Sequence, residues 1–294
     1  MRRLSIALIA AASTVALTQL ASAADLPRKA PVYVPPVPVA DWSGVYVGLE
    51  GGYGWGKQNF DPAFDPFSGP VGMAVDLPWA EGGHPSIGSV TQRGGLFGGF
   101  FGVQKQWGSW VLGLEGDIDG ASIKGSATSS AVENLASAFL VCALQGECLT
   151  SSTRSVSIDS KIDMLGSVRG KVGFVLAPDW LLYGTGGLAF AHVKNTVTVN
   201  ETDHYNDAGG WVESNTMSAS GGTSMFGWAA GAGVDWKFWH DAGSAWILGV
   251  EYLHYGFGTN TITVTDNAGS SIAINATEKV DTIKGRISYL FSIH

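Results

Sequence analysis

Eight segments of the chain alternate between apolar residues and polar or small residues with a period of two. Each is rich in Gly, Val, Leu and aromatic residues. This period is typical of β-strands, whose successive side chains point to opposite faces of a sheet. No segment after residue 23 offers about 18 consecutive apolar residues, so membrane-spanning helices are not expected. We predict strands at about 43–55, 93–107, 109–125, 156–176, 180–199, 223–239, 245–264 and 277–291.

The predicted connections alternate between short and long. Tight turns lie at 108–109, 177–179 and 240–244, and a tryptophan followed by aliphatic residues and glycine stands at or just after each one. The repeating unit is therefore a hairpin. The long, polar connections are 56–92, 126–155, 200–222 and 265–276.

An even strand count, with short turns at one end and long loops at the other, is the arrangement of outer-membrane barrels. A β-sandwich has no reason to sort its connections by length. We therefore predict an all-β fold, an eight-stranded antiparallel up-and-down transmembrane β-barrel with short periplasmic turns and long extracellular loops. The alternative is a soluble sheet with a solvated, charged face.

The charged residues indicate which face of each strand points into the barrel, because period-two alternation alone occurs in soluble and membrane barrels alike. After Trp110, one face carries Leu112 and Leu114 and the other carries Glu115 and Asp117. Glycines share the polar face, as expected for a narrow lumen that bulky charged chains must fit. The apolar face is therefore predicted to meet lipid.

The segment 161–174 divides in the same way, with Ile162 on the apolar face and Lys161, Asp163 and Arg169 on the polar face. Buried charges persist only when they are paired and hydrogen-bonded, so an interior network is expected. The predicted lumen charge network consists of Glu50, Glu115, Asp117, Arg169, Lys171, Glu251, Lys284 and Arg286.

Counting from the turns predicts which of these charges meet. Glu115 lies five residues after Trp110, and Lys171 lies five residues before the end of the neighbouring strand at Leu176. We therefore expect Glu115 and Lys171 at a similar depth. The same count expects Glu251 and Arg286 to meet.

The stretch "DWKFWHDAGSAWILGVEY" (235–252) crowds three tryptophans around one turn. Amphipathic rings at strand ends are typical of the aromatic girdle at a membrane interface. Trp239, beside the turn, has no assigned direction. The predicted girdle at the turn end consists of Trp107, Trp110, Trp180, Trp236, Trp246 and Phe291.

The chain opens with Arg2 and Arg3, an apolar run and an A-x-A site, the pattern of a signal peptide (1–23) cut before Ala24. A proline-rich periplasmic linker follows at 24–41, and the barrel is expected at 42–294. Cleavage leaves 15 basic and 25 acidic residues, a net charge of −10 that argues against nucleic acid or an anionic membrane surface as a partner.

Candidate chemistry adds little. Cys142 and Cys148 are six residues apart, and in an exported chain they form a possible disulfide. The six histidines lie in no recognisable catalytic constellation, so we expect no enzyme activity, no cofactor and no metal site. "FDPAFDPF" (60–67) offers either a contact surface for a partner or rings folded over the barrel mouth.

Several motifs in order resemble the small outer-membrane immunogenic proteins, also labelled porin-family or opacity-like proteins, which belong with the OmpA/OmpX-like barrels. The resemblance covers all eight predicted strands and the proline-rich leader. Its motifs are "WSGVYVGLEGGYGWG" (42–56), "GGFFGVQKQW" (98–107), "WVLGLEGDI" (110–118), "GSVRGKVGFVLAPDWLLYGTGGLAFAHV" (166–193), "GWAAGAGVDW" (227–236) and "LGVEYLHYGFG" (248–258).

The resemblance implies a place in the outer membrane of a Gram-negative bacterium, with lipid and the barrel-assembly machinery as partners. Such proteins usually end on an aromatic residue, whereas here Phe291 is followed by three further residues. Three functions remain open. They are a structural barrel and surface antigen with a lumen closed by paired charges, a small porin, and an adhesin or receptor whose long loops bind host surface molecules.

Overall fold

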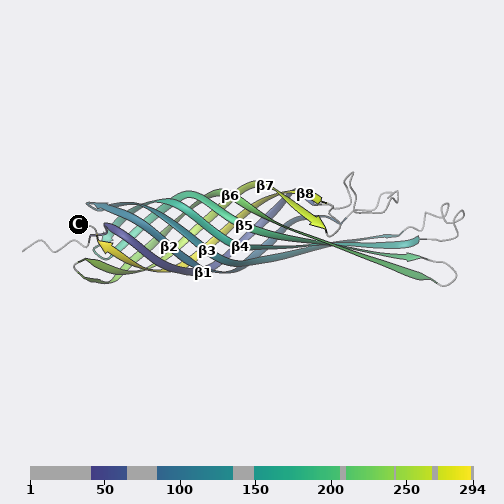
Figure 1. Ribbon diagram of the computed structural model, residues 1–294, viewed down its shortest axis with the longest axis horizontal. Helices are drawn as coiled ribbons and strands as arrows, with labels where there is room; N and C mark the ends of the chain where they lie inside the picture. The colour runs from purple at the N-terminus through teal and green to yellow at the C-terminus, as the bar shows by residue number, and fades with distance from the viewer. Residues whose placement is uncertain are drawn as a thin grey trace, which may run out of the picture. The chain divides into compact units, whose positions relative to one another are not determined.

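The computed structural model describes residues 41–64, 85–134, 149–205, 210–241, 243–266 and 271–292. The predicted signal peptide, nearly all of the predicted linker and both cysteines lie outside these ranges. Within them, no helix is long and apolar enough to cross a membrane. The strands are β1 (Gly44–Phe64), β2 (Ile87–Trp107), β3 (Trp110–Asn134), β4 (Leu149–Ala177), β5 (Trp180–Tyr205), β6 (Trp211–Asp241), β7 (Ser244–Asp266) and β8 (Ser271–Ser292) (Figure 1).

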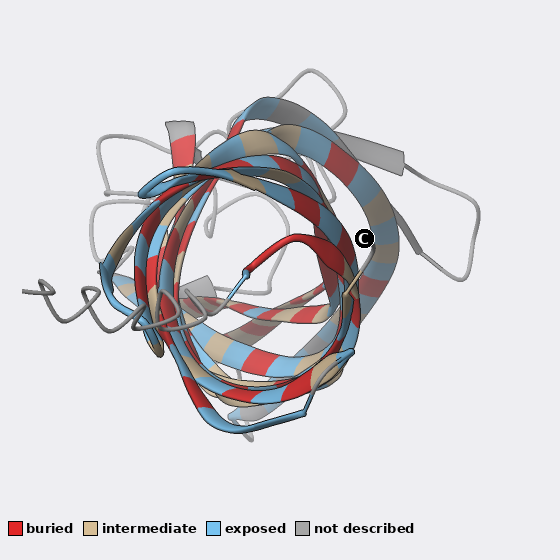
Figure 2. Cartoon of the chain, turned by 90° about the vertical axis from the view of Figure 1, so that its left-hand side faces the viewer, coloured by how far each residue is buried: buried red, intermediate tan, exposed pale blue. Residues whose placement is uncertain are grey.

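The eight strands form a closed barrel in chain order, each antiparallel to its neighbours, and β1 pairs with β8 to complete the ring. This confirms the predicted fold class. Along each strand, buried residues alternate with exposed ones, as the banding around the ring in Figure 2 shows. The alternation follows from the pleat, because a strand in a barrel wall has one face inside and one outside.

The strands are longer than the sequence pattern predicts. Residues 126–134 of β3 pair with 151–159 of β4, although we predicted a loop from 126 to 155. In the same way, 200–205 of β5 pair with 211–216 of β6. Serine, threonine and asparagine dominate these outer parts, so apolar alternation is weak there even though the hydrogen-bonded ladder continues.

A register shift between Ile162 and Met164 in the β4–β5 ladder corrects the predicted faces of β4. Ile162 is fully buried, whereas we placed it on the lipid face. Lys161 and Asp163, which we placed on the polar inner face with Arg169, point outward, and Asp163 pairs with Lys194, with 2.7 Å between Oδ2 and Nζ. One extra residue in a strand reverses the inside and outside assignment on one side of the bulge, and parity counted along the sequence cannot detect it.

Apolar side chains cover the outer wall from the end of the barrel with the tight turns toward the end with the long connections. On β3 the exposed outward residues run from Trp110 through Leu112 and Leu114 to Ile118, and beyond them come Ser122 and Lys124. On β1 the exposed apolar residues run from Val47 to Trp55 and are followed by Lys57. We call this zone the lipid-facing band, because transmembrane barrels carry such an apolar belt.

Candidate functional site in the barrel lumen

Trp42 fills the turn end of the lumen and is fully buried. Its backbone N–H donates to Gln106 Oε1 and its carbonyl accepts from Gln104 Nε2, both at 2.8 Å. Lys237 Nζ lies 4.1 Å from the centre of the Trp42 ring and donates to the carbonyl of Asp41 at 2.8 Å. The first residues of the barrel thus cross its own mouth and are held there from β2 and β6.

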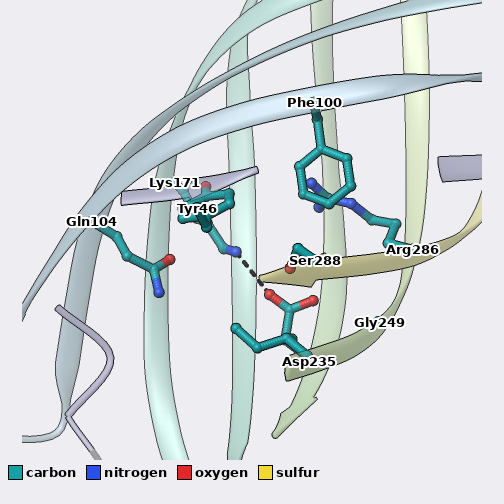
Figure 3. Close-up of a pocket in the computed structure, with 9 residues that line it drawn as sticks. Tyr46, Phe100, Gln104, Lys171, Asp235, Gly249, Arg286 and Ser288 are labelled. Carbon is teal, nitrogen blue, oxygen red and sulfur yellow. Dashed lines mark hydrogen bonds and ion pairs between the residues drawn. The ribbon is translucent and has the colours of Figure 1, made fainter. Parts of the chain in front are cut away.

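Lys171 and Asp235 form an ion pair on the lumen side of Trp42, with 2.8 Å between Nζ and Oδ2 (Figure 3). The Lys171 ammonium also lies 3.8 Å from the centre of the Tyr183 ring, within cation–π range. The Tyr46 hydroxyl donates to Glu115 Oε2 at 2.9 Å. The rings of Tyr46 and Tyr183 therefore both lie beside the Lys171 ammonium.

Eight charged residues from five strands meet in the middle of the lumen, and each is at most 5% exposed. Three are cations and five are carboxylates, so the formal charge of the group is −2. Taking such charges out of water is costly unless each finds a partner. We call this group the lumen cluster, and it consists of Glu50, Glu115, Asp117, Asp119, Arg169, Glu251, Lys284 and Arg286.

Arg169 on β4 contacts three carboxylates. Its guanidinium nitrogens lie 2.9 Å from Glu115, 3.1 Å from Asp117 and 3.1 Å from Glu251. A planar guanidinium presents several donors in a fixed fork, which suits it to bridging separate carboxylates. Arg169 therefore links β3 to β7 across the interior.

Arg286 on β8 makes a second set of three ion pairs. It lies 2.7 Å from Glu115, 3.1 Å from Glu251 and 3.3 Å from Glu50. Its guanidinium carbon lies 3.8 Å from the centre of the Phe100 ring. Because Glu115 and Glu251 each contact both arginines, the two arginines belong to one connected network.

Lys284 is the third cation. Its Nζ lies 2.7 Å from Glu50, 3.3 Å from Asp117 and 2.5 Å from Asp119. The carboxylate oxygens of these three acids lie within 4.8 Å of one another, a spacing that would also suit a metal ion. The Lys284 ammonium contacts all three acids, so the protein's own cation holds this position.

Inward-facing glycines provide the space that these side chains need. A Cβ added at Gly102 would overlap the ring of Tyr46, and one added at Gly98 would overlap the carboxylate of Asp119. Outward-facing Gly116 is different, since a Cβ there meets only the Ser167 carbonyl oxygen at 3.8 Å. Glycine on the lumen wall is therefore a packing requirement where a large side chain approaches from the neighbouring strand.

The structure places all eight residues of the predicted lumen charge network inside the barrel, each at most 5% exposed. The expected meeting of Glu251 and Arg286 is present as an ion pair. Glu115 and Lys171, expected at a similar depth, are two residues apart in the β3–β4 ladder, where Glu115 lies opposite Arg169, and Lys171 makes its ion pair with Asp235. The β7–β8 ladder has the same two-residue offset, since Glu251 lies opposite Lys284, and there the long Arg286 side chain spans it. Counting from turns missed both offsets because the connections between these strands are long and leave their stagger free.

Sequence reasoning left Asp119 and Asp235 out of the network, although both share the polar-face parity of their strands. Alternation could have found them. The part played by Tyr46 and Tyr183 could not be found in this way, because an aromatic residue in a barrel strand points inward or outward without changing the apolar pattern. Only the cross-strand register brings these rings to the charges.

Above the lumen cluster the interior becomes apolar. Tyr255 and Phe257 are stacked, with ring centres 6.1 Å apart, and Ile123, Ile162 and Leu165 are fully buried beside them. Further polar groups lie beyond the lipid-facing band. They include Gln92, whose amide donates to Ser160 and Glu278, and the pair of Arg154 and Glu201.

The six residues of the predicted girdle all lie on the outer wall and are 40–57% exposed. Trp180 and Trp236 stack with ring centres 5.8 Å apart, and Trp246 packs edge-on against Tyr289 at 5.1 Å. Trp239, left without a direction by the sequence, is exposed and lies opposite Trp246. Trp42, which sequence reasoning left out, is the tryptophan that points inward at this end.

Two other features singled out in the sequence are partly described. Phe60 of "FDPAFDPF" is buried in the apolar interior on the loop side of the lumen cluster. The side chains of the other two phenylalanines lie outside the described residues. His254, assigned to no constellation, has Nδ1 2.7 Å from Asp281 Oδ1, and the Tyr252 hydroxyl donates to the same oxygen. No described serine, threonine or cysteine is hydrogen-bonded to this group.

A closed ring of antiparallel strands with an apolar outer wall, aromatic side chains at the turn end and a charged interior defines an outer-membrane β-barrel. The family model for the outer membrane protein beta-barrel domain matches residues 7–289, and the chain belongs to that family. This confirms the predicted family and the predicted place in the outer membrane.

Curated relatives match along nearly their whole length. The 31 kDa outer-membrane immunogenic protein of Brucella melitensis is 26% identical over 293 residues, covering 98% of this chain and 97% of the relative. The 25 kDa outer-membrane immunogenic protein of Brucella abortus is 25% identical, covering 99% and 100%. Among solved structures, Ail of Yersinia pestis is 14% identical, with a TM-score of 0.26 over 83% of this chain and 99% of Ail. OprG of Pseudomonas aeruginosa is 10% identical, with a TM-score of 0.30 over 85% and 97%.

Proposed function

We propose that this protein is a structural barrel and surface antigen of the outer membrane, with a lumen closed by paired charges and no catalytic activity. The observation that carries the proposal is the lumen cluster, in which each of three cations contacts three carboxylates between β1, β3, β4, β7 and β8. These contacts cross the interior instead of lining a channel. The contribution of the barrel to the envelope is then mechanical and does not depend on transport.

The packing on the turn side of the lumen cluster supports closure. The cavity between Tyr46, Phe100, Lys171 and Arg286 measures about 10 Å³, roughly the space of a single water molecule. Eight-stranded barrels have interiors just wide enough for side chains to fill. A path for solutes would require several buried ion pairs to break together, so we rank the small-porin function second.

Conductance in planar bilayers tests the proposal directly. We expect the refolded protein to give no stable single-channel steps. A Tyr46→Ala/Phe100→Ala variant removes two rings that lie beside Lys171 and Arg286 in the lumen. It serves as a positive control for access of ions to the lumen. Folding of both proteins is checked by the heat-modifiable shift on gels. Stable, large steps from the folded wild-type protein would contradict closure and favour the porin.

A receptor function is favoured by one observation on the outer parts of β4, β5 and β6. Their outward face carries hydroxyl and amide groups that bond across strands, as in Thr216 to Asn200 at 2.9 Å and Thr198 to Ser218 at 3.4 Å. Such a surface, on which hydroxyl and amide groups outnumber charges, suits saccharides. Binding to a glycan array, measured for the refolded protein and for the Thr198→Val/Thr216→Val variant, tests this receptor function. Equal binding by both proteins would show that this face is not the saccharide site.

A further inference from the structure

Six basic side chains lie together on the outer wall, just beyond the lipid-facing band. Each points away from the lumen, and five are exposed while Lys161 is half-buried. They come from six consecutive strands of the ring, β8 and β1 to β5. We call them the basic arc, and its members are Lys57, Arg93, Lys124, Lys161, Lys194 and Lys279.

The strand register makes the arc nearly continuous. Arg93 lies opposite Lys124, Lys124 opposite Lys161, and Lys161 opposite Lys194. Lys279 lies opposite Lys57 in the β8–β1 ladder. Trp55, the register partner of Arg93, is two residues from Lys57, so the two runs are diagonal neighbours.

Without an anionic partner, this arrangement lowers the stability of the barrel, because like charges directly opposite each other on a sheet repel. Among the described residues, Lys194 alone has an ion pair within the arc, with Asp163. The other outward acids at this level are Asp159, two residues from Lys161, and Asp281, which bonds Tyr252 and His254. Six cations thus face three carboxylates on this part of the wall.

The arc contrasts with the rest of this acidic chain, whose net charge led us to expect no binding to an anionic membrane surface. Every basic residue of the described barrel wall points into the lumen or belongs to the arc, except Lys105 near the turn end. General surface charge therefore does not explain the arc. The position of the arc explains it. The lipid-facing band ends there on the loop side of the barrel, and the anions at that level of the membrane are lipid headgroups of the outer leaflet.

We propose that the basic arc binds the phosphate groups of phosphorylated lipid in the outer leaflet. Clustered Lys and Arg at a membrane surface are recognition sites for anionic lipid. The phosphates would supply the negative charge that the opposed lysines lack and would tie the barrel wall to the leaflet around it. This goes beyond the proposed structural function and does not depend on whether the lumen is closed.

The test uses the refolded barrel and diphosphoryl lipid A as the probe, with bound lipid counted by native mass spectrometry from mixed micelles. The variants are Lys161→Gln and Lys124→Gln/Lys161→Gln/Lys194→Gln, and Lys105→Gln is the matched control outside the arc. About 1 kcal/mol per basic residue near an anionic surface corresponds to about a fivefold loss of affinity. We expect that loss for Lys161→Gln, on the order of a hundredfold for the triple variant, and none for Lys105→Gln.

Stability in phosphatidylcholine vesicles gives a second readout. Without lipid A, the triple variant should unfold at the same temperature as the wild type or a higher one, because repulsion within the arc is relieved. Lipid A should then raise the unfolding temperature of the wild type but not of the triple variant. Equal binding of dephosphorylated lipid A, or unchanged binding by the triple variant, would overturn the proposal. So would inorganic phosphate that stabilises the wild type as much as lipid A does.

Discussion

Glu50 and Arg286 lie directly opposite each other across the ladder that joins β1 to β8, and Arg286 Nε is 3.3 Å from Glu50 Oε2. This pair joins the first and last strands inside the barrel wall, at the seam that closes the ring. Arg286 continues to Glu115 and Glu251, and Glu50 continues to Lys284. Closure of the sheet and formation of the lumen cluster are therefore expected to be coupled.

Replacing Lys284 with Met should lower the free energy of unfolding by about 3–5 kcal/mol, because it leaves buried carboxylates without their cation. Lys105→Met, on the outer wall, is the control and should change it by less than about 0.5 kcal/mol. Urea titration of tryptophan fluorescence in phosphatidylcholine vesicles measures both. Adding Asp119→Asn to Lys284→Met should recover part of the loss, and an additive loss instead would contradict the shared-cation arrangement.

Asp119→Asn and Asp235→Asn should differ although each removes one buried carboxylate. The lumen cluster has a formal charge of −2, so neutralising Asp119 relieves repulsion as it weakens an ion pair, and a change below about 1 kcal/mol is expected. Asp235 is the ion-pair partner of Lys171, so its loss leaves a buried cation and should cost about 3 kcal/mol. Equal losses in the same urea titration would show that the excess of acids has no effect.

Gly102→Ala should destabilise the barrel by about 1–3 kcal/mol, because the new methyl group overlaps the Tyr46 ring and displaces its hydroxyl from Glu115. Gly116→Ala is the matched control on the lipid side, where the added Cβ has space. Its effect should stay within about 0.5 kcal/mol. Urea unfolding compares the pair, and a neutral Gly102→Ala would contradict the close approach of Tyr46.

Lipid quenching of fluorescence should separate Trp42 from Trp180. Trp42 is fully buried in the lumen, whereas Trp180 is 43% exposed on the outer wall at the turn end. In vesicles of brominated lipid, Trp180→Phe should remove quenched emission, and Trp42→Phe should remove emission that bromine does not quench. Quenching of Trp42 to the same degree as Trp180 would place Trp42 outside the barrel.

Much of the fold could be predicted from sequence because a barrel strand has a period of two, and the charges on Glu115, Arg286 and their neighbours identify the inner face. The short polar segments at 108–109, 177–179 and 240–244 also locate the three tight turns. The outer parts of the strands were missed because, beyond the lipid-facing band, neither face must be apolar. There the ladder hydrogen bonds hold the strands and leave no hydropathy pattern.

The sequence by itself determined the strand number, the alternation of short and long connections and the inward direction of most charges. Each of these depends on neighbours along the chain. Only the tertiary structure decided that Arg169 instead of Lys171 faces Glu115, that the bulge after Ile162 reverses a face, and that the basic arc is nearly continuous. These depend on the stagger between strands joined by long connections, which local pattern does not specify.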